Sequence, residues 1–304
     1  MYDLIIIGAG PAGITASVYA ARKKMNFIVI TVDVGGQAAW SGDIENYTGY
    51  QFITGPELAM KFEDHMLNYG ITLKENEPVV ELKRFSDRIL VRTGKGEYES
   101  RAAIIASGKV SRELGVPGEK EFKNKGLTYC ATCDGPLFSG KDVAVIGGGN
   151  SALDAALQLM KIARRVYIIN NTEKLGGDDV MREKVEGASN VKIYNGTRVL
   201  SITGDKAVTG IELGNEAGEE TVAVQGVFVE IGLLPNSGFA VDVKKNEHQE
   251  IIIDCDNRTN VPGIFAAGDV TNVPEKQIVI AAGEGSKAVL SAFKYLNQMK
   301  IDEN

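Results

Sequence analysis

The amino-acid sequence predicts an α/β protein with two dinucleotide-binding domains. Two observations predict it: an apolar strand, a glycine-rich turn and a helix follow one another twice, and a further strand follows each time. The turns are Gly8-Ala9-Gly10-Pro11-Ala12-Gly13 and Gly147-Gly148-Gly149-Asn150-Ser151-Ala152. In this context the glycines let the backbone approach a pyrophosphate at the helix N-terminus, which is typical of a Rossmann-like fold.

Length and composition are those of a soluble globular protein. The 304 residues suffice for two domains, and 44% are hydrophobic and 24% charged. A formal charge of -7 argues against a nucleic-acid or membrane-surface role. The first apolar run follows no basic region, and no run approaches the roughly 20 apolar residues of a membrane helix. Three cysteines are too few for a secreted disulfide scaffold. We therefore expect a cytoplasmic protein.

The first fingerprint lies between a strand over residues 2–7 and a helix over 14–22. A second strand, 27–31, leads to Asp33, twenty residues after Gly13. An acid at this distance hydrogen-bonds a ribose hydroxyl in dinucleotide sites, although an ordinary loop acid is the alternative. The glycine- and amide-rich passages that follow suit close contact with a flat cofactor, or are plain connections. They include Gly36, Gln37 and Asn46.

Between the two fingerprints lie Cys130 and Cys133, followed directly by Asp134 and a Gly-Pro turn signal. In a reducing compartment this spacing favours a dithiol that opens and closes as a disulfide. Half of a zinc site and two incidental buried cysteines are the alternatives. Zinc needs four ligands, and the remaining candidates form no second closely spaced pair: Cys255, His65 and His248.

The second fingerprint is flanked by strands over residues 142–146 and 166–169 and a helix over 153–162. After the later strand, an acid would bind a ribose 2′-hydroxyl and an arginine a 2′-phosphate. The chain has neither there. Asn170 or Asn171 can bond a hydroxyl without neutralising a phosphate, or serve as turn residues.

Three more buried strands run into glycine. They end at Ser107-Gly108, at Gly232 and at Gly268-Asp269. The last helix, predicted over Gln277–Leu296, has small residues near its start and can therefore pack closely against another element.

Together these motifs resemble the low-molecular-weight thioredoxin reductase family of FAD-dependent pyridine nucleotide-disulfide oxidoreductases, over essentially the whole chain. The stretches Cys133–Phe138, Glu230–Asn236 and Lys276–Gly285 are also similar to the flavoprotein subunit of bacterial alkyl hydroperoxide reductase. That subunit carries an additional N-terminal thioredoxin-like part. Without it, a relay to a peroxidase is expected to need a separate small carrier.

The resemblance implies two Rossmann-like domains of the three-layer ββα type, with the nucleotide domain inserted into the FAD domain. The FAD domain is expected to comprise residues 1–112 and 244–304, and the pyridine-nucleotide and redox-disulfide domain residues 113–243. The residues implied to contact FAD are Gly8, Gly10, Gly13, Gln37, Asn46, Gly268, Asp269, Gln277 and Ile278. Those implied to hold the pyridine nucleotide are Gly147, Gly149, Asn150, Ser151 and Ala152. Further candidate cofactor-binding residues are Pro11, Ala12, Asp33, Gly36, Ser107, Gly108, Asn170 and Gly232.

By the same resemblance, electrons pass through FAD to a Cys130–Cys133 disulfide and then to a thioredoxin or glutaredoxin-like protein. Cys133 would face the flavin, Cys130 would attack the partner and Asp134 would be the acid–base group. The resemblance also implies a homodimer and a swivelling nucleotide domain, with hinges expected at 109–117 and 242–247. A peroxiredoxin acceptor is an alternative. A flavoprotein that senses redox state without turnover is a remote one.

The electron donor is expected to be NADH. NADPH-using relatives carry arginines after the strand of the second domain, and this chain has Asn171, Thr172 and Gly176 at the matching places. Reduced ferredoxin or NADPH is the alternative donor, and no metal site is expected.

Overall fold

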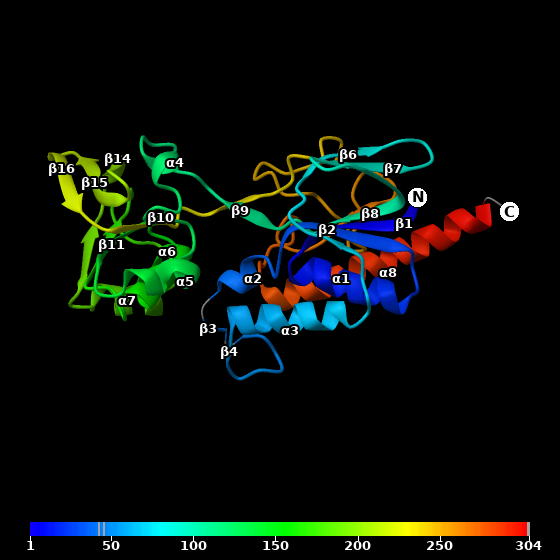
Figure 1. Ribbon diagram of the computed structural model, residues 1–304, viewed down its shortest axis with the longest axis horizontal. Helices are drawn as coiled ribbons and strands as arrows, with labels where there is room; N and C mark the ends of the chain where they lie inside the picture. Colours follow the sequence, from blue (N-terminus) through cyan, green and yellow to red (C-terminus); the bar gives the residue numbers. More distant parts are fainter. Residues whose placement is uncertain (42, 45, 303–304) are drawn as a thin grey trace. The chain divides into compact units, whose positions relative to one another are not determined.

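The computed structural model describes residues 1–41, 43–44 and 46–302 and divides into two compact units (Figure 1). Unit 1 comprises Met1–Val110 and Leu234–Asn304, and unit 2 comprises Ser111–Leu233. The chain passes between them through β9 (Lys109–Ser111) and β18 (Leu233–Pro235), which pair as a two-stranded sheet. Unit 2 is thus inserted into unit 1.

The second boundary lies after Leu233, whereas the sequence predicts it after residue 243. The intervening segment belongs to unit 1 because Phe239, Ala240 and Val243 are buried in one core with Ile5 and Ile7. The polar run that follows Val243 has the composition of a linker but lies inside unit 1. The first boundary, after Val110, lies close to the predicted one after residue 112.

The sheet of unit 1 has the strand order β5-β2-β1-β8-β7-β6, and β19 also pairs with β8. The pairs among β5, β2, β1, β8 and β19 are parallel, and those among β8, β7 and β6 are antiparallel. The strands are β1 (Tyr2–Ala9), β2 (Phe27–Val34), β5 (Leu73–Lys74), β6 (Val79–Arg84), β7 (Ile89–Thr93), β8 (Glu97–Ile105) and β19 (Ile264–Ala266).

Alternation along β1 divides unit 1 into layers, because successive side chains point to opposite faces of a strand. Leu4 and Ile6 lie in a core with helices α1 (Pro11–Arg22), α3 (Gly55–Leu67) and α8 (Ile278–Asp302). Figure 1 shows these helices on one side of the sheet. The opposite core, with Ile5, contains residues of β7 and of the segment 239–270. The remaining short elements are α2 (Gln37–Trp40), β3 (Asp43–Ile44) and β4 (Ile53–Thr54).

The small residues of the last helix have a defined partner. A Cβ on Gly285 would lie 2.0 Å from the carbonyl oxygen of Ala12, so α8 and α1 approach more closely than any larger residue would permit. The predicted close packing is therefore confirmed, and its partner is the fingerprint helix.

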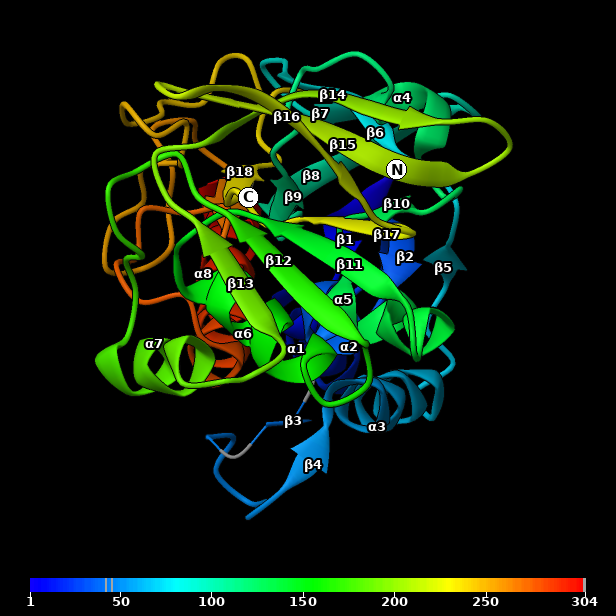
Figure 2. The same ribbon diagram turned by 90° about the vertical axis from the view of Figure 1, so that its left-hand side faces the viewer.

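Unit 2 contains a parallel sheet of order β10-β17-β11-β12-β13 and an antiparallel sheet of order β14-β15-β16. Figure 2 shows β11, β12 and β13 side by side. The strands are β10 (Leu127–Thr128), β11 (Asp142–Ile146), β12 (Arg165–Ile169), β13 (Val191–Tyr194), β14 (Arg198–Gly204), β15 (Val208–Asn215), β16 (Gly218–Ala223) and β17 (Gly226–Val229). The helices are α4 (Glu119–Phe122), α5 (Ala131–Asp134), the 3₁₀ turn η1 (Gly135–Phe138), α6 (Asn150–Leu159) and α7 (Asp179–Glu186).

Unit 2 repeats the layering of unit 1. Val143 and Val145 of β11 pack with α6, and Ala144 and Ile146 pack with the three-stranded sheet. In unit 2 the layer opposite the helices is the three-stranded sheet, and in unit 1 the core opposite the helices is formed with β7 and the segment 239–270. Each unit thus has helices packed on one face of a sheet with parallel central strands, which confirms the predicted pair of Rossmann-like domains. Among the helices that the structure describes, none is long and apolar enough to cross a membrane.

Candidate cofactor and redox sites

The glycines of the first fingerprint have two different roles. Gly8 has φ +104°, and its Cβ would lie 2.3 Å from the carbonyl oxygen of Ala106. A Cβ on Gly13 would lie 1.9 Å from the oxygen of Gly8. Gly10 differs, because the nearest atom to its Cβ position is the Cα of Gly36, at 3.9 Å. Packing therefore requires Gly8 and Gly13, whereas Gly10 leaves space for a phosphate.

Helix α1 begins directly in this space. Its N-cap is Gly10, which has no side chain to cap the helix, and Pro11 is the first helical residue. The backbone N–H groups of the first turn have no intrahelical partners. Together with the helix dipole they form an anion-binding end, which fits a dinucleotide pyrophosphate.

Four of the predicted FAD contacts come from distant parts of unit 1. Asn46 Nδ2 donates to Gln277 Oε1 over 3.1 Å, directly before α8 begins. Gln37 Nε2 donates to the carbonyl oxygen of Lys109 over 3.0 Å. Ile278 packs with Ile44 in a small apolar cluster. The structure thus places Asn46 beside Gln277 and Ile278, and holds Gln37 near the end of the first segment of unit 1.

Asp269 lies half-buried after the strand β19. Burial raises the pKa of its carboxyl group, and the charges of Lys109 and Lys276 oppose that rise. Both lysines are held by Glu250, at 3.4 Å and 3.0 Å from its Oε1. The preceding Gly268 has φ +77°, and its Cβ would lie 3.0 Å from the Cβ of Ala12. Because Gly268 packs against the fingerprint helix, Asp269 is a polar group beside the α1 terminus, and this arrangement fits FAD.

Asp33, Ser107 and Gly108 are further candidate cofactor-binding residues of unit 1. Asp33 lies within β2 with an exposed side chain, so its role stays a prediction. Ser107 Oγ donates to the oxygen of Asn236 over 2.6 Å, and Gly108 has φ +61°. Thr31 was not among the predicted residues; its Oγ1 accepts from Ala9 N at 3.1 Å and donates to the oxygen of Asp33. In the sequence, a threonine among the apolar residues 27–32 was the signal that could have indicated this role.

The second fingerprint divides its glycines in the same way. Gly147 has φ +136°, and its Cβ would lie 2.2 Å from the oxygen of Glu230. Around Gly149, the N-cap of α6, no described heavy atom lies within 4 Å of a Cβ position. Ala152 is fully buried. Unit 2 therefore also presents an open, uncapped helix start that fits a pyrophosphate.

Asn170 acts as a turn residue, which is the alternative that the sequence left open. It is buried, and its Nδ2 donates to the oxygen of Thr172 and to Asn195 Oδ1, at 3.1 Å and 2.9 Å. Its Oδ1 accepts from Thr172 Oγ1 at 2.9 Å. These bonds hold the loop after β12. A bond to a ribose hydroxyl would have to replace one of them. Asn150 also holds this region, because its Oδ1 accepts from Asp178 N at 2.8 Å.

The Cys-x-x-Cys segment follows β10, and α5 begins at Ala131, directly after Cys130. Thr128 Oγ1 accepts from the backbone N–H of Cys130 at 3.2 Å and donates to Asp134 Oδ2. The backbone N–H of Asp134 donates to the oxygen of Cys130 over 3.2 Å. The Asp134 carboxylate is therefore held beside Cys130 by Thr128, which sequence reasoning missed. The side chain of Cys133 lies outside the described part, so its predicted pairing stays a prediction.

Comparison with known proteins identifies the family. Residues 2–285 match the family model described as pyridine nucleotide-disulphide oxidoreductase. The chain belongs to this family. The thioredoxin reductase of Lactococcus lactis superposes with a TM-score of 0.89 at 35% identity, covering 98% of this chain and 100% of that one. The predicted resemblance is confirmed, and the family implies an oxidoreductase that uses FAD and NAD(P).

Two relatives of this oxidoreductase carry other names. One subunit of the alkyl hydroperoxide reductase of Staphylococcus aureus is 41% identical over 97% of this chain and 59% of its own length. A Bacillus subtilis protein named NADH dehydrogenase is 41% identical over 97% of this chain and 58% of its length. The chain therefore spans about three fifths of the length of the curated relatives that it matches.

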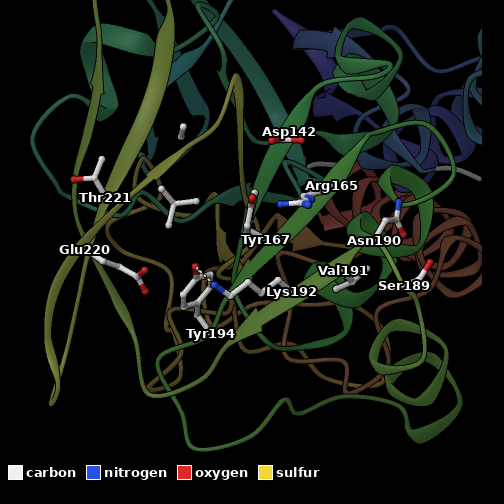
Figure 3. Close-up of a pocket in the computed structure, with 12 residues that line it drawn as sticks. Asp142, Arg165, Tyr167, Ser189, Asn190, Val191, Lys192, Tyr194, Glu220 and Thr221 are labelled. Carbon is white, nitrogen blue, oxygen red and sulfur yellow. Dashed lines mark hydrogen bonds between the residues drawn. The ribbon is translucent and has the colours of Figure 1, made fainter.

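Unit 2 of the oxidoreductase also contains a groove of about 470 Å³ between β12–β13 and β16 (Figure 3). Lys192 Nζ donates to Tyr194 Oη there over 2.6 Å. None of the predicted site residues is among the described residues that line it, which are Asp142, Arg165, Tyr167, Ser189, Asn190, Val191, Lys192, Tyr194, Glu220, Thr221, Val222 and Ala223. The groove is therefore separate from the second fingerprint.

Proposed function

We propose that this oxidoreductase passes electrons from NADH, through FAD and a Cys130–Cys133 disulfide, to a disulfide of a thioredoxin or glutaredoxin-like protein. One observation carries the proposal. The Cys-x-x-Cys helix, with the Asp134 carboxylate held beside Cys130, belongs to the same unit as a fingerprint that fits a pyridine nucleotide.

Unit 1 is the proposed FAD domain and unit 2 the nucleotide and disulfide domain. The open Gly10 position, the α1 N-terminus and Asp269 would hold FAD, and Gly149 with the α6 N-terminus would hold NADH. Bound FAD supplies two-electron chemistry: it takes a hydride from a reduced nicotinamide and can reduce a disulfide. The paired strands β9 and β18 are the proposed hinges, since both crossings of the chain run through them.

The chemistry of the dithiol follows thiol–disulfide exchange. The Cys130 thiolate attacks one sulfur of the partner disulfide, forming a mixed disulfide and releasing the other partner sulfur as a thiolate. The Cys133 thiolate then attacks Cys130 and frees the second partner sulfur. In balance, NADH, one proton and a partner disulfide give NAD⁺ and a partner dithiol. One observation supports the pairing: Cys255, the third cysteine of the chain, is free and exposed.

Asp134 is the proposed acid–base group for these exchanges. Its carboxylate accepts a hydrogen bond from Thr128, which also holds the Cys130 backbone. A carboxylate held by the same threonine as the attacking cysteine can take its proton and return one to a leaving thiolate. The acceptor has a second candidate: the relatives named alkyl hydroperoxide reductase favour a relay that ends at a peroxiredoxin. We also propose a homodimer in the cytoplasm.

The donor assay tests this function directly. Anaerobic protein reconstituted with FAD should lose its flavin absorbance near 450 nm (about the wavelength of oxidised flavins) on addition of NADH. NADPH should act far more slowly, because nothing at Asn171 or Gly176 can neutralise a 2′-phosphate. If reduced ferredoxin bleached the flavin and neither nucleotide did, ferredoxin would be the donor in place of NADH. If none of the three bleached the flavin, the proposed function would be rejected.

The donor preference should be reversible by charge. Arginine at Asn171 and Gly176 is expected to strengthen NADPH binding by about tenfold or more, because guanidinium groups bind phosphate bidentately. Both positions can accept a side chain: Asn171 is exposed, and the Cβ of Gly176 would lie 3.5 Å from the nearest atom. Titrations with 2′,5′-ADP and 5′-AMP measure the effect. An equal gain for both ligands would show mere charge attraction without a 2′-phosphate site.

A further inference from the structure

Glu230 and Asp154 are two acidic side chains beside the second fingerprint. Glu230 directly follows β17, and its backbone N–H donates to the oxygen of Ile146 over 2.7 Å, which continues the β17–β11 ladder by one residue. Asp154 lies on α6, four residues after Asn150. Residues at this spacing share one helix face, one turn apart.

The alternation along β17 shows where Glu230 points. Val227 and Val229 lie in the core with the three-stranded sheet, whereas Phe228 lies in the core with α6. The Phe228 ring contacts Phe138 of η1 edge to face, with centroids 5.2 Å apart. Because strand side chains alternate, Glu230 lies on the same face as Phe228, toward the layer that contains α6 and Asp154.

Hydrogen bonds fix Asp154 relative to the redox helix. Gln158 Nε2 donates to Asp154 Oδ2 over 2.8 Å, and Gln158 Oε1 accepts from Thr132 Oγ1 at 2.9 Å. Thr132 lies between the two cysteines. A hydrogen-bonded chain thus runs within unit 2 from the Cys-x-x-Cys helix to Asp154.

The electrostatics agree with this geometry. Burial and then the charge of Asp154 raise the pKa of Glu230 to about 8. Two other acids belong to the elements packed around β17. Asp134, after β10, accepts from Thr128, and Asp142, at the start of β11, is paired with Arg164 Nη2 at 2.6 Å. Asp154 is therefore the charged neighbour that acts on Glu230.

The strand order indicates which half of a nucleotide lies here. A dinucleotide follows the carboxyl ends of the strands, with its pyrophosphate at the first turn and its adenosine near the end of the second strand. In unit 2 that second strand is β12, and β17 lies on the other side of β11. The nicotinamide half would therefore lie beside Glu230.

We propose that Glu230 and Asp154 bind the positively charged ring of the oxidised nucleotide in preference to the neutral reduced ring. This inference rests on the proposed function, since it assumes that unit 2 holds the pyridine nucleotide. Glu230 is neutral below about pH 8 and charged above it. A charged carboxylate attracts the cationic ring, so NAD⁺ should bind more tightly as pH rises through this range.

Calorimetric titration of the oxidised, FAD-loaded protein tests the inference at about pH 6.5 and about pH 9.5. Three probes are used: NAD⁺; its redox-inert tetrahydro derivative, whose ring is neutral; and ADP-ribose, which has no ring. NAD⁺ should bind about tenfold more tightly at the higher pH, which corresponds to a lowering of the Glu230 pKa by about one unit on binding. The other two probes should bind equally at both pH values.

Glu230→Gln keeps the size of the side chain and should remove the pH dependence of NAD⁺ binding while ADP-ribose affinity stays constant. Asp154→Asn should weaken NAD⁺ binding at both pH values. Glu220→Gln, in the separate groove, is the control and should behave as the unaltered protein. If the pH dependence persisted in Glu230→Gln, or if ADP-ribose showed the same dependence, this inference would be overturned. The proposed function would be unaffected. Failure of every probe to bind would overturn the proposed function together with this inference.

Discussion

Replacing Cys130 by serine is expected to slow reduction of the partner disulfide by at least about 10³-fold while NADH still reduces the flavin. A serine hydroxyl is not ionised near neutral pH, and the thiolate is the nucleophile of disulfide exchange. Cys133→Ser should have the same two effects, because the resolving sulfur is lost. The measurements are anaerobic flavin bleaching by NADH and, separately, NADH-dependent reduction of thioredoxin or a glutaredoxin.

Cys255→Ser is the matched control for both variants. Cys255 is free and exposed, so its replacement should leave both half-reactions unchanged. Full disulfide reductase activity in Cys130→Ser would contradict the proposed dithiol relay. Loss of flavin bleaching in that variant would instead indicate that the substitution disturbs the fold of unit 2 or cofactor binding.

The glycines of the first fingerprint should respond to alanine in opposite ways. Gly13→Ala is expected to cost about 3 kcal/mol of stability or more, because its Cβ would lie 1.9 Å from the backbone oxygen of Gly8. Gly10→Ala should keep the fold, because Gly10 has extended backbone angles and its added Cβ would lie 3.9 Å from the nearest atom, the Cα of Gly36. Its methyl group would occupy the pyrophosphate space, so FAD affinity should fall by about tenfold or more.

Thermal unfolding of the FAD-free protein and FAD titration separate these effects. Gly149→Ala is a useful comparison, since it has the same extended geometry in unit 2 and should leave FAD affinity unchanged. Equal FAD affinity in Gly10→Ala and the unaltered protein would show that the cofactor does not use this turn. An unchanged melting temperature in Gly13→Ala would contradict the packing argument.

Local patterns in the sequence determined the two-domain α/β fold. A buried strand, a fingerprint and a helix are contiguous in the chain, and each requires its residue types for a local reason. The small residues of the last helix likewise predicted close packing. The family resemblance rested on such contiguous motifs and was confirmed by the match over residues 2–285.

Only the tertiary structure decided contacts between segments far apart in the chain. It assigned residues 234–243 to unit 1, because their apolar side chains complete a core with Ile5 and Ile7. It showed that Asn170 holds its own loop, and that Thr128 orients Asp134. It also brought Glu230 to the face of α6. Single side chains in loops and strand ends have no periodicity, so their partners become visible only when the strands are placed side by side.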